Sequence, residues 1–425
     1  MSDRASSPPT ALDPFLTDAH RRLWETVDAF AAAEIAPRAA RADADPTVVE
    51  REIPRLLADQ GWFGVTLPED IGGMQAGHVA RVILIHRLAR VSAAAAAILQ
   101  ASLIPVAALH HFYGGRRRTT QLLLAVSERR ALPSIAVTEP EHGGHLGGIQ
   151  TTAERTKSGW MLTGVKTAVG NSHIADLHIV VARTAAPGVR TSQALTAFVV
   201  DATARGVTLA QHRPALGLHG FSFGEIRLDR VRVRDDQRLG EVGEGFAVAQ
   251  SSSILYGRPN LAAVDLGLHE RAVSLAVRHT TARPRHGATL ADLGVVQDRL
   301  GRITANANVA RLLLYHGAHL LDRGLPCDQQ LITAKLVGHE LAADSGSIAL
   351  ELHGAHALHA GHPLARVWQD IQTTYAPAGT GEIQRLRLAQ AAVEDETTPH
   401  DQHRPQWSQL LADRLRHHPP LTTAA

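Results

Sequence analysis

The sequence predicts an α+β protein in which a helical domain is followed by a β-domain and then by a second helical domain. Apolar residues recur every three or four positions in residues 16–130 and again in residues 245–391, which is the spacing of helices that bury one face. Between residues 132 and 242 this period shortens toward two, in short segments bounded by Gly, Pro, Asn or Asp. The length of 425 residues exceeds the roughly 250 to 300 that one core supports, so several domains are expected.

The first block contains two long runs with helical spacing, LWETVDAFAAAEIAPRAA and VARVILIHRLARVSAAAAAILQASLIPVAALHHF. The segment LPEDIGG (67–73) lies between them, and its Pro and Gly residues predict a loop. We therefore assign residues 1–131 to an N-terminal helical domain.

The middle block contains six segments whose side chains alternate in the manner of strands: SIAVTEP, GWMLTGVKTAV, LHIVVART, LTAFVVDA, VTLAQH and EIRLDRVRV. Several short strands at this spacing predict a small β-barrel or sandwich. We assign residues 132–243 to this middle β-domain.

The third block returns to helical spacing, in AVDLGLHERAVSLAVRHTTA and VVQDRLGRITANANVARLLLYHGAHLLD. Residues 244–394 are therefore expected to form a C-terminal helical bundle. Residues 395–425, rich in His, Pro, Asp and Thr, are expected to form a surface tail.

Composition excludes several classes of protein. The 43 Lys and Arg against 41 Asp and Glu give no reason to expect a nucleic-acid partner. The single cysteine, Cys327, excludes an intramolecular disulfide and a cysteine-cluster metal site, and no metal is expected. The segment MSDRASSPPTALDPF lacks the apolar core of a signal peptide, and no run reaches the roughly 18 apolar residues of a membrane helix. We therefore expect a protein of the reducing cytoplasm that does not enter a membrane.

Two glycine-containing turns are candidates for ligand binding. The segment AVTEPEHGGHLGGIQTTAE (136–154) places a Gly-rich turn after a strand, where exposed backbone N–H groups can meet a carbonyl or anionic group. The segment TYAPAGTGEIQR (374–385) breaks from a loop into a helix. Taken alone, the first favours an ordinary tight turn, and the second a loop followed by an N-cap Thr.

Five stretches together resemble the acyl-CoA dehydrogenase family. TEPEHGG is similar to its TEPxxGS signature and LPEDIGG to its N-terminal loop; LTGVKTAVGNSHIADLHIVVART resembles its strand pair, GEGFAVAQSSSILYGRPNLAAVDLGL the start of its long C-terminal helix, and YAPAGTGEIQR its YxxxEGTsEIqR turn. They occur in the family's order and cover about residues 15–392. The resemblance implies an N-terminal helical domain, a middle β-domain and a C-terminal four-helix bundle, with FAD and an acyl thioester held between the last two.

The resemblance also implies cofactor contacts. The residues expected to contact FAD are Val137, Thr138, Gly143, Gly144, Val169, Gly170, Arg283, Gln297, Gly354, Gly379, Thr380 and Glu382. Of these, Arg283 and Gln297 match the family residues that bind the FAD pyrophosphate.

Several positions near these depart from the family's pattern. The family has Ser and Asp at Gly144 and His145, Trp-Ile-Thr at Ala168-Val169-Gly170, Phe at His286, Gln at Glu351, and a second Gly at Ala355. These changes remove an aromatic wall and a hydroxyl beside the flavin, so the resemblance implies a weakened or exchangeable FAD.

The family's catalytic base is absent. Dehydrogenation of an acyl thioester removes a weakly acidic α-proton, usually with a glutamate whose pKa is raised by burial. The family places this glutamate at one of two positions, which here are Ala378 and Gly257, and neither side chain can take a proton. Removing a general base typically costs about 10²–10⁴ in rate.

Some groups of the family's substrate site remain. Arg258 matches the family's Arg beside the substrate, and the backbone N–H of Ala378 can still polarise a thioester oxygen. The candidates for a replacement base are Tyr256, His142, Glu141 and Tyr375, although each is more readily explained by a structural role.

Three functions are consistent with this sequence. The first is oxidation of an acyl thioester, carried by CoA or a carrier protein, with a non-standard base or reaction in specialised metabolism. The second is a monooxygenase that uses reduced flavin and O₂, and the third a non-catalytic binding homologue. The expected partners are a second copy of the chain, in a homodimer or homotetramer, and either an electron-transfer flavoprotein or a flavin reductase.

Overall fold

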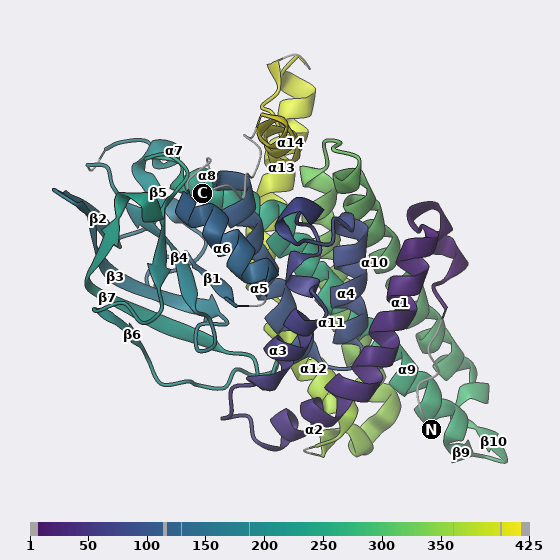
Figure 1. Ribbon diagram of the computed structural model, residues 1–425. Helices are drawn as coiled ribbons and strands as arrows, with labels where there is room; N and C mark the ends of the chain where they lie inside the picture. Colours follow the sequence, from purple (N-terminus) through teal and green to yellow (C-terminus); the bar gives the residue numbers. More distant parts are fainter. Residues whose placement is uncertain are drawn as a thin grey trace.

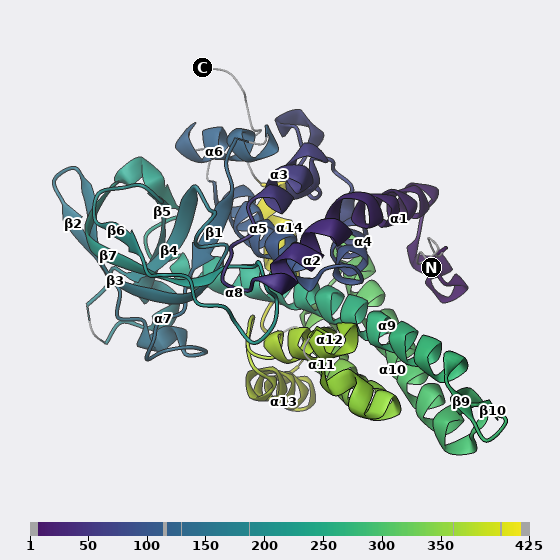
Figure 2. The ribbon, with the colours of Figure 1, turned by 90° about the horizontal axis from the view of Figure 1, so that it is seen from below.

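The computed structural model describes residues 7–113, 117–128, 130–186, 188–359, 361–399 and 402–417. It confirms the three successive blocks: helices, a β-domain, and helices again (Figure 1). Seen from below, the β-domain forms one side of the molecule and the helices pack together on the other (Figure 2).

The N-terminal domain surrounds two buried helices, α4 and α5. Its elements are η1 (Thr10–Phe15), α1 (Asp18–Phe30), η2 (Ala31–Ile35), α2 (Ala36–Ala44), α3 (Glu52–Asp59), η3 (Trp62–Gly64), η4 (Glu69–Ile71), α4 (Gly77–Ala89), α5 (Ala93–Phe112) and α6 (Arg117–Ser127). Helix α5 is long and apolar enough to cross a membrane, but 89% of its most apolar stretch is buried inside the fold. It is therefore a core helix, and it supplies one wall of the site described below.

The β-domain is one curled, mixed sheet. Its elements are β1 (Pro133–Ala136), η5 (Leu146–Gly148), β2 (Thr152–Thr156), β3 (Gly159–Gly170), β4 (Leu177–Arg183), α7 (Thr191–Ala194), β5 (Leu195–Asp201), β6 (Val207–Leu209), β7 (Phe223–Arg234), η6 (Asp235–Gln237) and β8 (Arg238–Leu239). The strand order is β6-β7-β3-β2-β4-β5-β8, with β1 parallel to β4. Trp160 on β3 and Phe198 on β5 lie with ring centroids 5.4 Å apart. Because two strands separate β3 from β5 in this order, the sheet must curl around its own core.

The C-terminal domain is built on three long helices that lie side by side (Figure 2). Its elements are α8 (Gly245–Ser252), η7 (Ser253–Gly257), α9 (Arg258–Ala282), β9 (Pro284–Arg285), β10 (Ala288–Thr289), η8 (Leu290–Asp292), α10 (Gly294–Asp322), α11 (Asp328–His353), η9 (Gly354–Leu358), α12 (Pro363–Thr373), α13 (Gly381–Thr397) and α14 (Trp407–Arg416). The boundary that we placed at residue 394 falls inside α13.

A proline interrupts the long helix that enters this domain. Helices α8 and α9 are continuous through the π turn η7, and Pro259 follows that turn directly. Proline has no N–H, so the carbonyl of Leu255, four residues earlier, loses its α-helical partner. Arg81 on α4 donates to that carbonyl from Nη2 at 3.0 Å. A buried guanidinium thus takes the place of a missing backbone donor.

The expected surface tail contains a helix that is fastened to the body of the protein. Asp328, at the start of α11, accepts hydrogen bonds from the backbone N–H groups of Trp407 (2.7 Å) and Ser408 (3.0 Å), the first residues of α14. Arg414, near the end of α14, pairs with Glu244 at 2.9 Å. The part of the tail that the structure describes is therefore anchored at two points.

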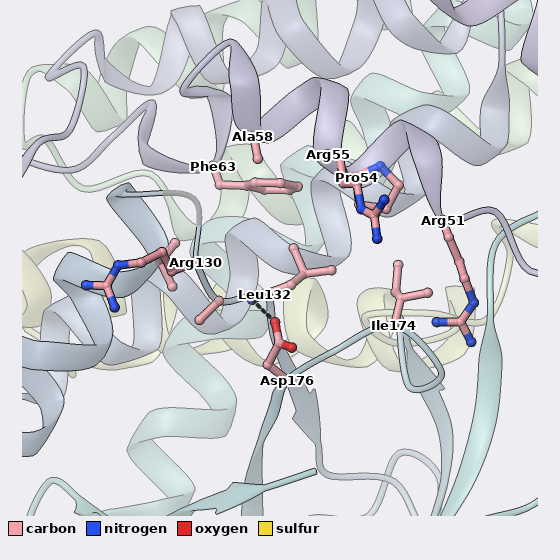
Figure 3. Close-up of a pocket in the computed structure, with 11 residues that line it drawn as sticks. Arg51, Pro54, Arg55, Ala58, Phe63, Arg130, Leu132, Ile174 and Asp176 are labelled. Carbon is pink, nitrogen blue, oxygen red and sulfur yellow. Dashed lines mark hydrogen bonds between the residues drawn. The ribbon is translucent and has the colours of Figure 1, made fainter. Parts of the chain in front are cut away.

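A cavity of about 320 Å³ lies between α3 and the β-domain (Figure 3). Phe63 and Leu132 contribute apolar lining, and the exposed Arg51 and Arg55 together with Asp176 contribute charged lining. None of the residues that we expected to bind FAD or substrate lines this cavity. It is thus separate from the site that the sequence predicts.

Candidate active site

The turn between α12 and α13 is held by two side chains that bind its carbonyl groups. Lys335, buried on α11, donates from Nζ to the carbonyl oxygens of Tyr375 (2.7 Å) and Gly379 (3.1 Å). Gln384, on the first turn of α13, donates from Nε2 to the carbonyl oxygens of Ala378 and Gly379, both at 3.1 Å. The backbone of this turn is therefore fixed from one side.

The N–H groups of Gly379 and Thr380 point to the other side, because they belong to the peptides whose carbonyls Lys335 and Gln384 bind. A trans peptide directs its N–H opposite to its C=O, and the described residues include no cis peptide. The N–H groups of Ala378, Gly379 and Thr380 have no backbone or side-chain acceptor among the described residues. Thr380 is the N-cap of α13, but its side chain makes no capping hydrogen bond. The turn therefore presents donors, at a helix N-terminus, to a carbonyl or anionic group.

The two positions at which the family carries its glutamate face each other. A Cβ atom placed on Gly257 would lie only 3.0 Å from the Cβ of Ala378, and 3.8 Å from Cδ1 of Ile104 on α5. Ala378 itself has a φ of 57°, in the left-handed region that disfavours most side chains. The space between these two backbones thus contains one methyl group and no acid.

The Gly-rich loop after β1 is fixed by a buried ion pair. Glu139 accepts hydrogen bonds from the backbone N–H groups of Gln150 (2.7 Å) and Thr151 (2.9 Å) and from Lys166 Nζ (2.8 Å). Burial acts to raise the pKa of Glu139, but Lys166 and the N–H donors together hold that pKa below its usual value. Burial lowers the pKa of Lys166 to about 8. The pair anchors both ends of the loop onto β3.

Contacts between single residues bring three of the predicted segments together. A Cβ on Gly144, in the first loop, would lie 3.4 Å from Ile383, and a Cβ on Gly379 would lie 3.6 Å from the same side chain. At the end of β3, a Cβ on Gly170 would lie 3.1 Å from Ala101 on α5. The loop after β1 and the turn before α13 therefore meet at Ile383 of α13, and the end of β3 meets the middle of α5.

The end of β3 has an irregular backbone at the position where the family commonly has tryptophan. The register of β3 against β7 shifts between Lys166 and Val169, and Ala168 in this bulge has a φ of 53°. Val169 is buried. Bulges of this kind redirect a strand beside functional sites.

Three of the expected FAD contacts lie far from this cluster. Arg283 follows the last residue of α9, Gln297 lies in the first turn of α10, and Gly354 follows α11. The 25 residues of α9 correspond to about 37 Å at 1.5 Å per residue, so Arg283 is roughly that distance from Arg258. One chain therefore does not bring all the expected contacts to a single place.

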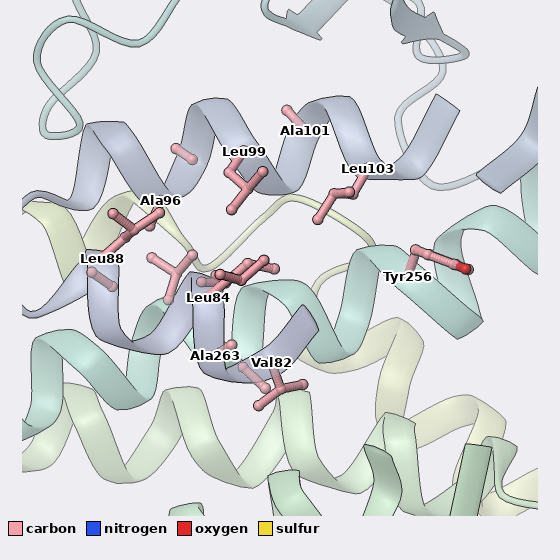
Figure 4. Close-up of a cluster of buried hydrophobic side chains, with 14 of the residues drawn as sticks. Val82, Leu84, Leu88, Ala96, Leu99, Ala101, Leu103, Tyr256 and Ala263 are labelled. Atoms are coloured by element: carbon pink, nitrogen blue, oxygen red, sulfur yellow. The ribbon is translucent and has the colours of Figure 1, made fainter. Parts of the chain in front are cut away.

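The candidate replacement bases are occupied elsewhere. The Tyr256 hydroxyl donates a hydrogen bond to Thr66 Oγ1 (3.1 Å), and the Arg81 guanidinium lies 4.0 Å from the centroid of the Tyr256 ring. Burial raises the pKa of Tyr256. Figure 4 shows its ring at the end of the apolar cluster formed by α4, α5 and α9. Tyr375 donates its hydroxyl to the Glu382 carboxylate (3.0 and 3.1 Å). These contacts favour structural roles for both tyrosines.

The other two candidate bases lie in the loop after β1. His142 Nε2 is 3.3 Å from the amide nitrogen of Gln150, and Glu141 is exposed. Neither has a contact to Gly257 or Ala378 among the described residues, so both remain sequence-based predictions.

Sequence reasoning missed Lys335, Gln384 and Ile104. Lysine is almost never fully buried unless it is paired, so a single Lys within the apolar run LITAKLV was a usable signal for Lys335. Gln384 belongs to the quoted motif GEIQR, but its bonds to the turn depend on the three-dimensional fold. Ile104 has no distinguishing sequence signal, since it is one apolar residue among many on α5.

The residues present fit a flavin. The turn before α13 offers unpartnered backbone donors, and a Cβ on Gly143 would have no atom within 4 Å, so the backbone of the first loop is accessible to a flat ring. Together they offer main-chain donors between a β-domain and a helical bundle, an arrangement that suits the carbonyl edge of a flat heterocycle such as a flavin.

Family comparisons agree with a flavin site. Models of the acyl-CoA dehydrogenase N-terminal, middle and C-terminal domains match residues 17–118, 134–231 and 243–393. The chain therefore belongs to the acyl-CoA dehydrogenase family, whose cofactor is FAD and whose members are oxidoreductases.

Individual relatives are similar over nearly their whole length. An acyl-CoA dehydrogenase of Bacillus subtilis (strain 168) is 29% identical, over 85% of this chain and 94% of its own. A 3-(aryl)acrylate reductase of Clostridium sporogenes (strain ATCC 15579) is 28% identical, over 88% of this chain and 98% of its own. The structure of butyryl-CoA dehydrogenase from Megasphaera elsdenii superposes with a TM-score of 0.84 and 26% sequence identity, covering 89% of this chain and 99% of its own.

Proposed function

We propose that this protein is an FAD-dependent oxidoreductase that binds an acyl thioester, carried by CoA or a carrier protein, and transforms it without the family's glutamate base. The observation that carries the proposal is the pairing of an intact donor turn with two empty base positions. The N–H groups of the turn at Ala378 have no acceptor in the described part of the chain, and a Cβ added to Gly257 would lie 3.0 Å from the Ala378 methyl group.

The chain has groups that can bind a thioester, but it lacks an acid that could remove the α-proton. The N–H groups of Ala378 and Gly379 are suited to hold the thioester oxygen and increase the acidity of the α-carbon. Lys335 and Gln384 keep those donors in place by binding the carbonyls on the far side. When bound, FAD supplies a hydride acceptor. Ordinary α,β-dehydrogenation is expected to be slow, because no acid occupies the position from which the α-proton is taken.

A second candidate function is a monooxygenase that receives reduced flavin from a partner. The same observation favours it, since attack by flavin-activated O₂ does not require a glutamate beside the α-carbon. It predicts oxygen-dependent turnover and no need for an electron-transfer flavoprotein.

The test is the visible spectrum of the purified protein, followed by anaerobic titration with saturated acyl-CoAs. We expect flavin absorbance that shifts when an acyl thioester binds but does not bleach. Rapid bleaching by a straight-chain acyl-CoA would contradict the proposed loss of dehydrogenation. Absence of both flavin and any response to thioesters would support a binding homologue instead.

We also propose that the functional unit contains at least two copies of the chain. Arg283, Gln297 and Gly354 lie at the opposite end of α9 from Gly379, so one chain cannot offer both groups of contacts to one FAD. A second copy, packed against the long helices, would supply the missing set. We expect a dimer or tetramer in sedimentation velocity, and an Arg283→Gln variant that loses FAD while keeping that assembly. A monomer that retains FAD at nanomolar concentration would contradict this arrangement.

A further inference from the structure

The first residue of α9, Arg258, carries a buried positive charge that forms no ion pair within the described part of the chain. Arg258 is only 3% exposed, and neither its Nε nor its Nη1 has a hydrogen-bond partner among the residues that the structure describes. No described carboxylate forms an ion pair with it. An isolated buried charge costs several kcal/mol, so chains rarely retain one unless something pairs with it in the working state.

The charges around Arg258 do not neutralise it. Asp328 is the acid that interacts with it electrostatically, but Asp328 uses Oδ1 and Oδ2 to bind the N-terminus of α14. Arg387 on α13 is a like charge, and Lys335 is a second one. Burial first, and then Arg387, lower the pKa of Arg258 to about 10, so the guanidinium is still charged at neutral pH. The surroundings of Arg258 at the start of α9 therefore have an excess of positive charge.

The place of Arg258 links this charge to the two empty base positions. It directly follows Gly257, where an added Cβ would touch Ala378, and it interacts with Lys335, which binds the turn on either side of Ala378. In the family's pattern, a glutamate at one of these two positions accompanies this arginine. Here the cation has been kept and the carboxylate has not.

We propose that the substrate supplies that carboxylate: the acyl group of the thioester bears a second, free carboxylate that pairs with Arg258. A guanidinium binds a carboxylate through its N–H donors, and Nε and Nη1 of Arg258 lack hydrogen-bond partners among the described residues, so donors on two edges of this group remain available for one. This inference rests on the proposed function, because it assumes that a thioester binds at the turn.

The experiment compares matched thioesters on the FAD-bound protein. Succinyl, glutaryl and adipyl thioesters are titrated anaerobically against butyryl, valeryl and hexanoyl thioesters of equal carbon number, with the shift of the flavin spectrum reporting binding. We expect at least one dicarboxylic thioester to bind at least tenfold more tightly than its neutral match. Equal affinities across every pair would overturn the inference.

A phosphate of the carrier is the alternative source of negative charge, and a second arm separates the two. Each acyl group is tested both as the CoA thioester and as the N-acetylcysteamine thioester, which has no phosphate. Preference for the dicarboxylic acyl group should persist in the N-acetylcysteamine series. Dependence on Arg258 that appears only with CoA would assign the residue to the carrier phosphate and overturn the inference.

The variants are Arg258→Gln, Arg258→Lys and, as a matched control, Arg387→Gln on the exposed face of α13. Arg258→Gln should abolish the preference, Arg258→Lys should keep part of it, and Arg387→Gln should leave it within about threefold. Arg258→Gln should also raise the thermal midpoint of the substrate-free protein, because it removes an unpaired buried charge. A lowered midpoint with an unchanged preference would make Arg258 a structural residue. A wild-type protein that responds to no thioester at all would instead contradict the proposed function.

Discussion

At the scale of single residues, the site combines a strained backbone with the lack of an acid at Ala378 and Gly257. Ala168 and Ala378 both have a positive φ, of 53° and 57°, and they lie on the β3 end and the α13 turn that border the site. Such conformations cost about 1–3 kcal/mol and persist where surrounding contacts impose them. Around Ala378 those contacts are the bonds from Lys335 and Gln384, so the turn has kept its shape although its acid is gone.

Restoring the acid should therefore restore proton abstraction. In Ala378→Glu the new carboxylate extends from an existing Cβ into the space beside Gly257, and we expect saturated acyl-CoAs to bleach the flavin at least 10²-fold faster than in the wild type. Anaerobic stopped-flow absorbance measures this.

Ala378→Gln is the control, since it matches the size of Glu without a base. Bleaching by both variants would show that the carboxylate is not the cause, and bleaching by neither would show that substrate or flavin geometry has also changed.

Removing the clamp on the turn should weaken flavin binding without touching the flavin. Lys335→Met leaves the carbonyl of Tyr375 without its donor, and an unsatisfied buried group costs about 1–3 kcal/mol. We expect a lower thermal midpoint and a higher dissociation constant for FAD, measured by fluorescence. Lys335→Arg, which keeps a donor, should lose less of both. An unchanged FAD affinity in Lys335→Met would contradict the role given to the clamp.

Much of this site was accessible from motifs, but its geometry was not. The turn residues and the two empty base positions follow from local sequence, because each lies within a short matched stretch. Two features depend on helices that are far apart in sequence. Arg258 on α9 has no partner for Nε or Nη1 among the described residues, and Lys335 on α11 binds the turn that precedes α13. Such contacts are set by helix packing, which no local pattern specifies.

At the scale of elements, the proline-driven π turn η7 couples α4 to the start of α9. Pro259 deprives the carbonyl of Leu255 of its α-helical donor, and Arg81 binds that carbonyl instead. The same combination of a π turn followed by proline occurs at Ala31–Ile35 before Pro37. Both turns show a helix adapting to a proline by widening instead of breaking.

A double-mutant cycle tests this coupling. Arg81→Met should lower the free energy of unfolding by about 1–3 kcal/mol, because the Leu255 carbonyl is left unsatisfied. In a Pro259→Ala background the added N–H can donate to the Leu255 carbonyl. Arg81→Met should then lower the free energy of unfolding by about 1 kcal/mol less than it does in the wild type. Denaturant unfolding of the four proteins measures it, and strictly additive effects would rule the coupling out.

Elements were predictable where periodicity is strong, and less so at the C-terminus. The helical and strand blocks follow from apolar spacing. The anchored helix α14 was missed because its composition is polar and its attachment depends on Asp328, 79 residues before Trp407 in the sequence. Only tertiary contact turns such a segment from a tail into part of the fold.

At the scale of the whole molecule, α12 joins all three domains. Asp370 on α12 accepts a hydrogen bond from the backbone N–H of Leu218 in the β-domain (2.6 Å), and Arg366 pairs with Asp43 of α2 (2.9 Å). Asp370 is buried, and burial raises its pKa to about 7.

This carboxyl should make stability depend on pH. Because the folded pKa of Asp370 is raised above the unfolded value, its contribution is full below about pH 4 and is lost as pH rises through about 7. The loss is at most about 4 kcal/mol. Asp370→Asn keeps an acceptor for Leu218 without titrating, so its thermal midpoint should vary less than that of the wild type between pH 5 and 8. Parallel pH profiles would contradict this origin.

The π turn η7 also sets an angle. A π turn takes up one residue more than an α turn, and one residue corresponds to about 100° of rotation about the helix axis. Helix α8, which leads out of the β-domain, is therefore rotated relative to α9 by an amount fixed between Ser253 and Gly257. Deleting a single residue there would keep the helix continuous but turn the loop after β1 and the end of β3 away from the turn at Ala378. The relative orientation of two domains thus depends on the phase of one helix, and on a proline that keeps the extra residue in place.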